Sequence, residues 1–518
     1  MLVRLTNLFR TGSLQLPALL AVLFSICLIR ACIQSITIDE ADTFLVWAAR
    51  AEPSHWQAGS NNHVLNSLLI RFSTTAFGVS HLSLRLPALL GALLFMLTTA
   101  SLARQLFATW RGQCVFFIAI AANPLVMDYM VASRGYGLAL AFLAGQFLVL
   151  FHIDRTRDEE PPLRPPGLAA IASLLAALAF SSNFSFAIIS GVTWLFSLSL
   201  LCLHGPAGNH VAPEAYWKNR LRIAFWGIMP GAVLASALCA SVLADWKQIE
   251  LIYGATSLRE MLASVLDSSF HPLNPHLVNP VFYDLVSAFP RPLLWLILAA
   301  AALQGVWLLF HRPAHPDNRT KSLRRFACIT ASALLAALLL HTGMHLAWET
   351  LLPRERTAIY IPFLLTLAIG SLAAAGPVSP HLAARILNRC LRGGLVAAAL
   401  LFILCGRLTY FKEWQYDADV EAAYRVLTLS VPDPAFNNVY AHWRYTSSLN
   451  FYAWSPRDRV TERFRYLHPY PDGGAAYILY WPEDEEFARA AGLKVVYTGA
   501  QSDIVVALPP RPAPPVAH

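Results

Sequence analysis

Three carboxylates lie close together just after the first long apolar run of the chain. Asp39, Glu40 and Asp42 fall within residues 38 to 43, and Asp39 and Asp42 share one helical face because they are three residues apart. Near lipid headgroups, a partly desolvated carboxylate can take the proton of an attacking hydroxyl group, which is general-base catalysis. We therefore predict Asp39 as a general base. A helix cap or a solvated rim is the alternative interpretation, and it suits Asp42 better than Asp39.

Three arginines, Arg134, Arg354 and Arg356, are predicted at the same membrane rim as Asp39. A planar guanidinium group binds two phosphate oxygens at once and stays charged beside lipid. A leaving phosphate is a weak base, so it needs charge stabilisation rather than a proton donor. The pattern predicts that these arginines bind a departing phosphate while Asp39 activates a hydroxyl group. An arginine that merely extends its charge into the interface is the alternative for each of them.

A bundle of membrane-spanning helices must position these side chains. The chain has 518 residues, of which 56% are hydrophobic and 14% are charged, against about 25% charged residues in a soluble domain. Apolar runs long enough to cross about 30 Å of hydrocarbon recur from residue 16 to residue 411. Because lipid satisfies no backbone hydrogen bonds, we predict an all-α polytopic bundle with spans at 16–36, 86–103, 114–127, 135–153, 167–182, 185–203, 223–243, 293–311, 326–347, 358–375 and 393–411.

The basic residues set the predicted orientation. The net charge is +8, but the charges are spread through short loops rather than gathered on one soluble face, which argues against a nucleic-acid partner. By the positive-inside rule the N-terminus is cytoplasmic and the C-terminus lies outside. The loops assigned to the cytoplasm carry Arg4, Arg10, Arg104, Arg111, Arg155, Arg157, Arg164, Lys218, Arg220, Arg222, Arg312, Arg319, Lys321, Arg324, Arg325, Arg385, Arg389 and Arg392.

Three outer segments are too long to be simple turns. Residues 37–85 contain two amphipathic stretches, at 41–51 and 64–77, suited to the membrane interface. Residues 244–292 contain a helical pattern at 257–270 among many prolines. We predict a transmembrane domain at 1–411 and a small α/β periplasmic domain at 412–508, with helices at 417–430 and 483–491 and strands at 437–442, 475–481, 493–498 and 503–508. The Pro-rich end, 509–518, is predicted to be disordered.

Several short motifs in this order resemble a known family. They are the Asp39-Glu40 pair, the segment 61–66 with Asn61, Asn62 and His63, the segment 84–91 with Arg85, Ser133-Arg134-Gly135-Tyr136, and the region 353–357. Together they resemble membrane glycosyltransferases of the GT-C type. Within that type they are similar to bacterial relatives of the dolichyl-phosphate-mannose protein mannosyltransferases and of the aminoarabinose transferase that modifies lipid A. The likeness covers residues 15 to 150 best and hardly informs the tail.

The resemblance implies a sugar donor linked to a polyprenyl monophosphate. It implies Asp39 as the catalytic base and Glu40 as a supporting carboxylate. It also implies substrate-binding roles for the motif residues Asn62, His63, Arg85 and Tyr136. The family more usually has His-Pro-Pro-Leu where this chain has His-Val-Leu from residue 63, so a local hydrogen-bonding role for His63 stays open.

Other polar residues in the apolar runs have structural explanations as well as functional ones. Arg30 lies about 13 Å deeper than Asp39 along a helix, where we expect it to pair with a neighbouring helix. His341, His345 and Glu349 recur every four residues, a spacing compatible with a divalent metal, although a polar stripe toward the active cavity is the favoured interpretation. No cofactor is assigned. His271 and His276 lie among prolines and receive no role.

The sequence thus predicts an inverting glycosyltransferase of the bacterial inner membrane. Its donor is a polyprenyl-phosphate monosaccharide, and its acceptor is a hydroxyl group of a protein, a glycan or an envelope lipid. A transporter or flippase of lipid-linked glycans is one alternative, although no internal repeat is visible. A polymerase using a diphosphate-linked oligosaccharide and a non-catalytic envelope assembly protein are the others. No phosphate-binding glycine loop supports a nucleotide-dependent reaction.

Overall fold

A computed structural model describes most of the chain. The described residues are 14–49, 56, 62–156, 165–203, 213–244, 253–311, 317–376, 381–432, 437–455 and 463–510. Most of the predicted disordered tail lies outside them, from residue 511 onward. The motif residue Asn61 and several basic residues used for the predicted orientation also lie outside the described ranges, namely Arg4, Arg10, Arg157, Arg164 and Arg312.

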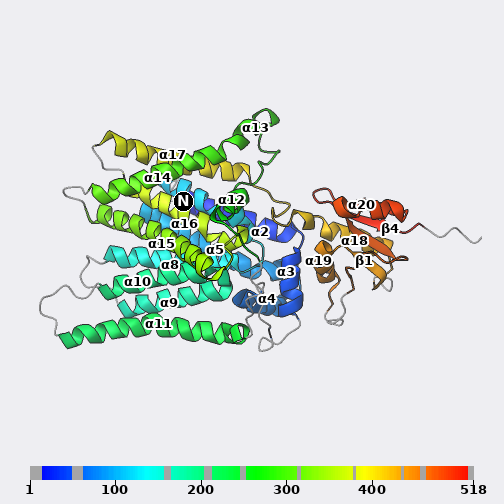
Figure 1. The fold of residues 1–518 in the computed structure, drawn as a ribbon, viewed down its shortest axis with the longest axis horizontal. Helices are drawn as coiled ribbons and strands as arrows, with labels where there is room; N and C mark the ends of the chain where they lie inside the picture. The colour runs from blue at the N-terminus through cyan, green and yellow to red at the C-terminus, as the bar shows by residue number, and fades with distance from the viewer. Residues whose placement is uncertain are drawn as a thin grey trace, which may run out of the picture.

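Within the described residues, ten helical segments are long and apolar enough to cross a membrane. These segments form an all-α, multi-pass membrane bundle (Figure 1). The spans are formed by α2 (Gln15–Ile33), α5 (His81–Leu106), α8 (Tyr136–Arg155), α9 (Pro165–Ser182), η4 (Phe184–Phe186) with α10 (Ala187–Leu203), α11 (Pro213–Ala244), α13 (Pro280–Ala288) with α14 (Pro290–Phe310), α15 (Asn318–Trp348), η6 (Glu355–Ala358) with α16 (Tyr360–Ala375), and α17 (Leu382–Leu404).

Most predicted spans match a helix but begin later than it does, and two are misplaced. Residues 114–127 do not form one spanning helix, because α6 (Trp110–Ala121) has only 12 residues and Asn123 then caps a separate short helix, α7 (Pro124–Tyr129). The last span is shifted toward the N-terminus: α17 ends at Leu404 rather than at residue 411. Its first turns carry arginines among apolar residues, and these interrupt the apolar run on which the prediction depended.

The long segments predicted on one side lie at the same end of the bundle (Figure 1). The first contains α3 (Ile38–Asp42), the π-helix η1 (Thr43–Ala48) and α4 (Val64–Phe77), in agreement with the two predicted amphipathic stretches. The second contains α12 (Leu258–Ser269), also as predicted. Pro280 and Pro290 start α13 and α14, since proline suits the first helical turn, whereas Pro272 and Pro275 lie outside the helices.

The C-terminal region forms a small α/β unit beyond that end of the bundle. Its four-stranded sheet has the order β1-β2-β4-β3, with β1 parallel to β2 and the other pairs antiparallel. All four strands and two of the helices were predicted. Helix α19 was not predicted, because its aromatic residues do not follow a clear helical periodicity. The elements are η7 (Gln415–Asp417), α18 (Val420–Ser430), β1 (Val439–Ala441), α19 (Trp443–Ala453), β2 (Ala476–Tyr480), α20 (Trp481–Ala490), β3 (Lys494–Thr498) and β4 (Ile504–Leu508).

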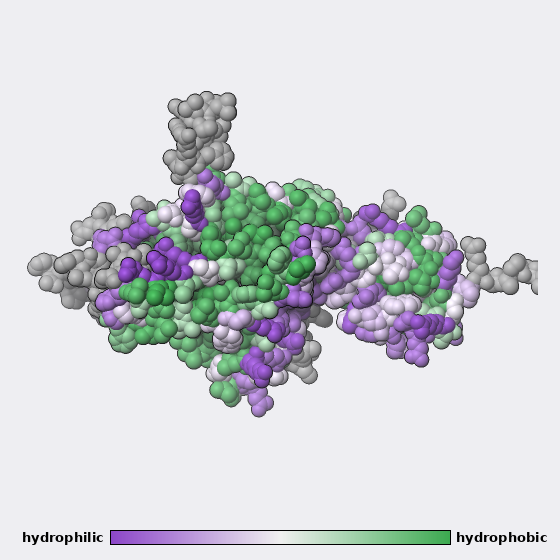
Figure 2. Space-filling model, turned by 90° about the horizontal axis from the view of Figure 1, so that it is seen from above, coloured by the Kyte–Doolittle hydropathy of each residue, from purple (hydrophilic) through white to green (hydrophobic). Residues whose placement is uncertain are grey.

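The surface of the bundle is apolar where lipid would cover it. Figure 2 shows hydrophobic residues over the middle of the bundle and hydrophilic residues toward its left end and over much of the C-terminal unit. Large apolar side chains such as Val233, Leu303 and Leu339 are more than half exposed on α11, α14 and α15. A soluble protein would bury such a belt, so the exposed helix faces agree with a lipid environment.

Candidate active site

Asp39 lies in the first turn of α3, directly after the first span. Thr37 caps this helix: its hydroxyl group accepts a hydrogen bond from the Glu40 amide at 3.2 Å, and the Glu40 carboxylate accepts one from the Thr37 amide at 3.1 Å. This capping box fixes the turn on which Asp39 sits. Asp42 precedes η1 but makes no capping hydrogen bond to it, so the interpretation of Asp42 as a helix cap is wrong.

Two arginines from distant parts of the chain converge on the Asp39 side chain. Arg356 Nη1 lies 3.1 Å from Asp39 Oδ2, and Arg134 Nη2 lies 3.7 Å from the same oxygen. Arg134 Nη1 also donates to the Asp39 carbonyl at 3.0 Å and to the Thr43 hydroxyl at 2.8 Å. The site therefore places the positive charges of two guanidinium groups beside one carboxylate oxygen.

A tight turn between α7 and α8 places Arg134. Gly135 adopts φ +74°, and a Cβ atom there would overlap the carbonyl oxygen of Ser182. Only glycine fits this left-handed and crowded position. Arg134 itself is fully buried, so its guanidinium group is directed by packing rather than by solvent.

Glu413 is a site residue that the sequence reasoning missed. Its carboxylate pairs with Arg356 and accepts a hydrogen bond from the Tyr129 hydroxyl group. Burial raises the pKa of Glu413, and Arg356 and Tyr129 only partly offset that effect. Arg356 is thus shared by Asp39 and Glu413. The sequence did contain a signal for Glu413. Like Asp39, it is an acidic residue close to the end of a span.

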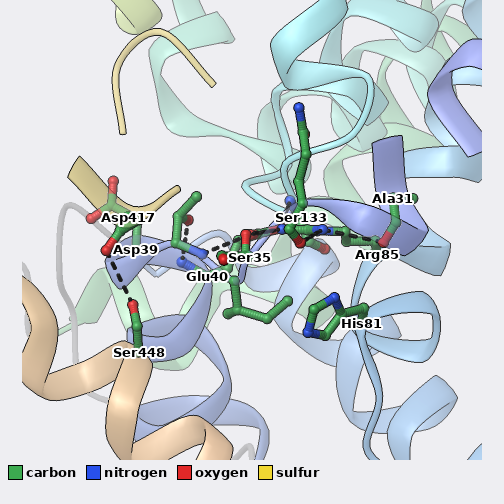
Figure 3. Close-up of polar contacts among 12 residues, drawn as sticks. Ala31, Ser35, Asp39, Glu40, His81, Arg85, Ser133, Asp417 and Ser448 are labelled. Atoms are coloured by element: carbon green, nitrogen blue, oxygen red, sulfur yellow. Dashed lines mark hydrogen bonds and ion pairs between the residues drawn. The ribbon is translucent and has the colours of Figure 1, made fainter. Parts of the chain in front are cut away.

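Glu40 and Arg85 form a buried ion pair behind the site (Figure 3). Arg85 donates to both Glu40 carboxylate oxygens, at 2.9 and 2.7 Å, and the Ser133 amide donates to Glu40 at 2.9 Å. Burial raises the pKa of Glu40, but the ion pair and the hydrogen bonds together outweigh it and hold the pKa below its usual value. The remaining donors of Arg85 bind the carbonyl groups of Ala31, Gln34 and Ser35.

The pair is positioned to hold the backbone rather than to touch substrate. Both side chains are 0% exposed, and the five N–H groups of Arg85 all have acceptors. Arg85, predicted to bind substrate, therefore joins the end of α2 to α3 and α5. Glu40 also accepts a hydrogen bond from the turn before Arg134, and its supporting role in catalysis stays a prediction.

His63, Asn62 and Tyr136 are buried, and His63 and Tyr136 lie near Arg134 and Arg356. The His63 ring meets Tyr136 edge-on, with ring centroids 5.5 Å apart, and its Nδ1 atom lies 3.1 Å from the Asn183 amide nitrogen. Its Nε2 atom is buried and has no hydrogen-bond partner in the part of the chain that the structure describes. Burial, with Arg134 and Arg356 nearby, holds the pKa of His63 well below its usual value, so the imidazole is neutral. Asn62 accepts a hydrogen bond from Ser67 at 3.3 Å.

Arg354 lies farther out than the other predicted phosphate ligands. Its side chain is 41% exposed and pairs with Glu260 at 3.2 Å and Glu355 at 3.5 Å. The structure therefore does not bring Arg354 to Asp39. Arg356, by contrast, is covered by Tyr253, with the guanidinium carbon 4.6 Å from the ring centroid.

Arg30 pairs with a neighbouring helix, as predicted. Its Nη2 atom lies 2.5 Å from Asp128 Oδ1 on α7. Asp128 also accepts a hydrogen bond from the Lys412 amide at 3.0 Å and lies 3.6 Å from His271 Nε2. His271 is buried rather than solvated, and its burial lowers the pKa to about 4. These contacts tie α2, α7 and the segment before Glu413 together.

The histidines of α15 do not gather around one point. His341 contacts the Tyr360 hydroxyl group at 2.6 Å, and His345 Nδ1 contacts the Thr350 carbonyl at 2.7 Å. Glu349 has left-handed backbone dihedrals at the end of the helix. Among the described residues, no group of three or more His, Cys, Asp or Glu side chains is arranged to hold a metal ion.

Comparisons with known proteins give distant structural similarities. No family model and no curated protein matches the chain. The crystal structure of ArnT from Cupriavidus metallidurans in the apo state is similar at 12% identity and a TM-score of 0.34, over 95% of this chain and 97% of that one. The crystal structure of the same protein bound to undecaprenyl phosphate is similar at 11% identity and a TM-score of 0.34. The apo structure of the Archaeoglobus fulgidus oligosaccharyltransferase is similar at 12% identity and a TM-score of 0.41, over 87% of this chain and 64% of that one. TM-scores this low establish no residue role.

Proposed function

We propose that the chain is an inverting glycosyltransferase that moves a monosaccharide from a polyprenyl-phosphate carrier to a hydroxyl acceptor at the outer face of a bacterial inner membrane. The observation that carries the proposal is the contact of Arg356 and Arg134 with one oxygen of Asp39 at the end of a membrane bundle. A base and a phosphate clamp side by side are what this displacement requires.

The proposed chemistry uses these groups in one step. The acceptor oxygen attacks the anomeric carbon, the bond between that carbon and the phosphate oxygen breaks, and Asp39 takes the proton of the acceptor hydroxyl group. The polyprenyl phosphate leaves with an additional negative charge, which Arg356 and Arg134 stabilise. Because Arg356 is held by Asp39 and Glu413, the donor phosphate must replace part of this pairing when it binds.

The surroundings supply further groups for the proposed substrates. The Nε2 atom of neutral His63, which has no hydrogen-bond partner among the described residues, offers one hydrogen bond to a sugar hydroxyl group. A cavity of about 630 Å³ runs along α16, the helix that follows Arg356, and is mostly apolar. We propose that this apolar space accepts part of the polyprenyl chain. Its lining residues include Leu262, Leu334, Ile361, Leu365, Leu401 and Phe402.

The decisive experiment is a transfer assay with the reconstituted full chain. Labelled polyprenyl-phosphate sugars are incubated with proteoliposomes, and donor consumption and labelled product are measured. Asp39→Asn should lower kcat by about 100-fold or more, because a positioned base contributes about 10²- to 10⁴-fold. Asp42→Asn, on the same short helix, is the matched control and should keep activity.

Three results would contradict the proposal. Donor consumption by Asp39→Asn at the wild-type rate would remove Asp39 as the base. Movement of intact donor across the sealed membrane, with no loss of its sugar, would identify a transporter. Turnover of a diphosphate-linked oligosaccharide in place of the monophosphate donor would identify a polymerase.

A further inference from the structure

The C-terminal unit contacts the turn that carries Asp39. Asp417 Oδ2 accepts a hydrogen bond from the Ile38 amide at 2.8 Å, one residue before Asp39. The Ser448 hydroxyl group contacts the other oxygen of Asp417 at 3.4 Å, as Figure 3 shows beside Asp39. Asp417 is only 1% exposed. A carboxylate from the C-terminal unit is therefore built into the start of α3.

Two more hydrogen bonds hold the residues before this turn. The Ile36 amide donates to the Tyr452 hydroxyl group at 2.9 Å, and the Ser35 hydroxyl group donates to the Ala418 carbonyl at 2.8 Å. These partners lie on α19 and directly after η7. Together with Asp417, they fix the backbone from residue 35 to residue 38 from the C-terminal side.

Aromatic packing extends the contact beyond Asp39. The Phe44 ring on η1 meets Phe451 and Trp454 edge-on, with ring centroids 5.4 and 5.2 Å apart. Phe44 and Phe451 are both buried and belong to one apolar cluster that also contains Ile36 and Ala41. Hydrogen bonds before Asp39 and ring packing after it thus restrain the segment on both sides.

We propose that the C-terminal unit is a positioning device for Asp39, in which Asp417 and Tyr452 hold the backbone so that the Asp39 carboxylate faces Arg356 and Arg134. This inference rests on the proposed glycosyl transfer. Asp417 and Tyr452 are positioning residues, because they act through the backbone of α3. If the Asp39 carboxylate is displaced by about 1 Å, the rate of transfer can fall on the order of 100-fold. We infer that Asp417 is buried, despite the free-energy cost of burying it, because it holds Asp39 in place.

The test compares variants that remove or keep the acceptor for the Ile38 amide. Asp417→Ala removes it and should lower kcat about 10- to 100-fold, with the KM for the donor nearly unchanged. Asp417→Asn keeps a carbonyl oxygen and should restore most of kcat. Tyr452→Phe keeps the ring and removes only the hydroxyl group, so it should lower kcat even if Asp417→Ala folds poorly.

Asp419→Ala is the matched control. Asp419 is also a hydrogen-bonded carboxylate of the C-terminal unit, but it binds Gln501 and Ser502, with distances of 2.8 to 2.9 Å, and not α3. Its loss should leave kcat within about twofold. A comparable fall in kcat for Asp419→Ala would mean that general destabilisation explains the effect, and would overturn the proposal.

Amide hydrogen exchange of the full chain separates this inference from the proposed function. Asp417→Ala and Tyr452→Phe should speed exchange in peptides covering residues 36–48, whereas Asp419→Ala should speed it near residues 499–503. Unchanged exchange at 36–48, or faster exchange with unchanged kcat, would overturn the positioning role. If the wild-type chain transfers no sugar from any donor, the proposed function fails, and exchange still decides whether the C-terminal unit restrains this segment.

Discussion

At the scale of single residues, Arg356 is shared by two carboxylates from distant parts of the chain. Asp39 follows the first span, and Glu413 follows the last one. A guanidinium group can serve both because its N–H groups point in several fixed directions. In the proposed reaction, the same property lets Arg356 exchange a carboxylate for a phosphate without losing its other partner. An ammonium group, which is a single point of charge, lacks this geometry.

Replacing Arg356 by lysine tests this geometry. Arg356→Lys keeps the charge and should still lower kcat/KM for the donor by about 100-fold, or about 2.7 kcal/mol, because the fork that bridges carboxylate and phosphate is lost. Steady-state transfer kinetics measure the effect. Arg425→Lys, at an exposed pair on α18, is the control. Equal loss in the two variants would argue against a phosphate role for Arg356.

At the scale of elements, the Glu40–Arg85 pair joins three helices. Its contacts reach the end of α2, the start of α3, α5 and the turn before α8. A fully buried ion pair adds little stability compared with apolar groups, but removing one partner leaves an uncompensated charge. The pair therefore fixes how these elements meet near Asp39.

Removing one charge of this pair should destabilise the bundle. Glu40→Gln should cost about 3–5 kcal/mol, since the Arg85 charge stays buried. Thermal unfolding in detergent should show a lower midpoint for Glu40→Gln, with partial recovery in the double variant Glu40→Gln/Arg85→Met. A Glu40→Gln chain as stable as the wild type would contradict the assigned role.

The burial of His271 beside Asp128 predicts that acid lowers the stability of the fold. The unfolded His271 imidazole takes up a proton near its ordinary pKa of 6.5, whereas burial lowers the pKa in the folded chain to about 4. Stability is thus unaffected above pH 6.5 and falls as the pH drops toward 4, by about 2 kcal/mol at pH 5. Between pH 7 and pH 5, His271→Asn should lose less thermal stability than the control His276→Asn. Equal losses would count against this assignment.

At the scale of the whole molecule, the site lies where the bundle meets the C-terminal unit. Helices α3 and α4 and the small sheet all lie toward one end of the bundle (Figure 1), and Asp39 belongs to α3. A donor anchored in lipid and an acceptor arriving from water can meet at such a junction. The proposed reaction therefore requires that this end faces the periplasm.

Reporter fusions test that orientation. Alkaline phosphatase folds only in an oxidising compartment, so a fusion after residue 510 should be active if the C-terminal unit is periplasmic. A fusion in the loop between α5 and α6, at residue 108, should be inactive. The reverse pattern would place the site on the cytoplasmic side and contradict the proposed donor geometry.

The sequence alone determined most of the local elements and pointed to several of the site residues, Asp39, Arg134 and Arg356 among them. Apolar runs, amphipathic stretches and strand-like segments depend on composition and period over a few residues, so most helices and all four strands could be predicted. Asp39 stood out because a carboxylate beside a span is costly. The ends of α6 and α17 were predicted poorly, since a break or a few arginines changes the apolar run more than it changes the helix.

Only the tertiary structure decided which charges meet. It brings Arg134 and Arg356 to Asp39, leaves Arg354 farther out, and buries Arg85 with Glu40. It also adds Glu413, which lies hundreds of residues from Asp39 along the chain. Such pairings depend on how the helices pack, and no local sequence pattern determines that packing.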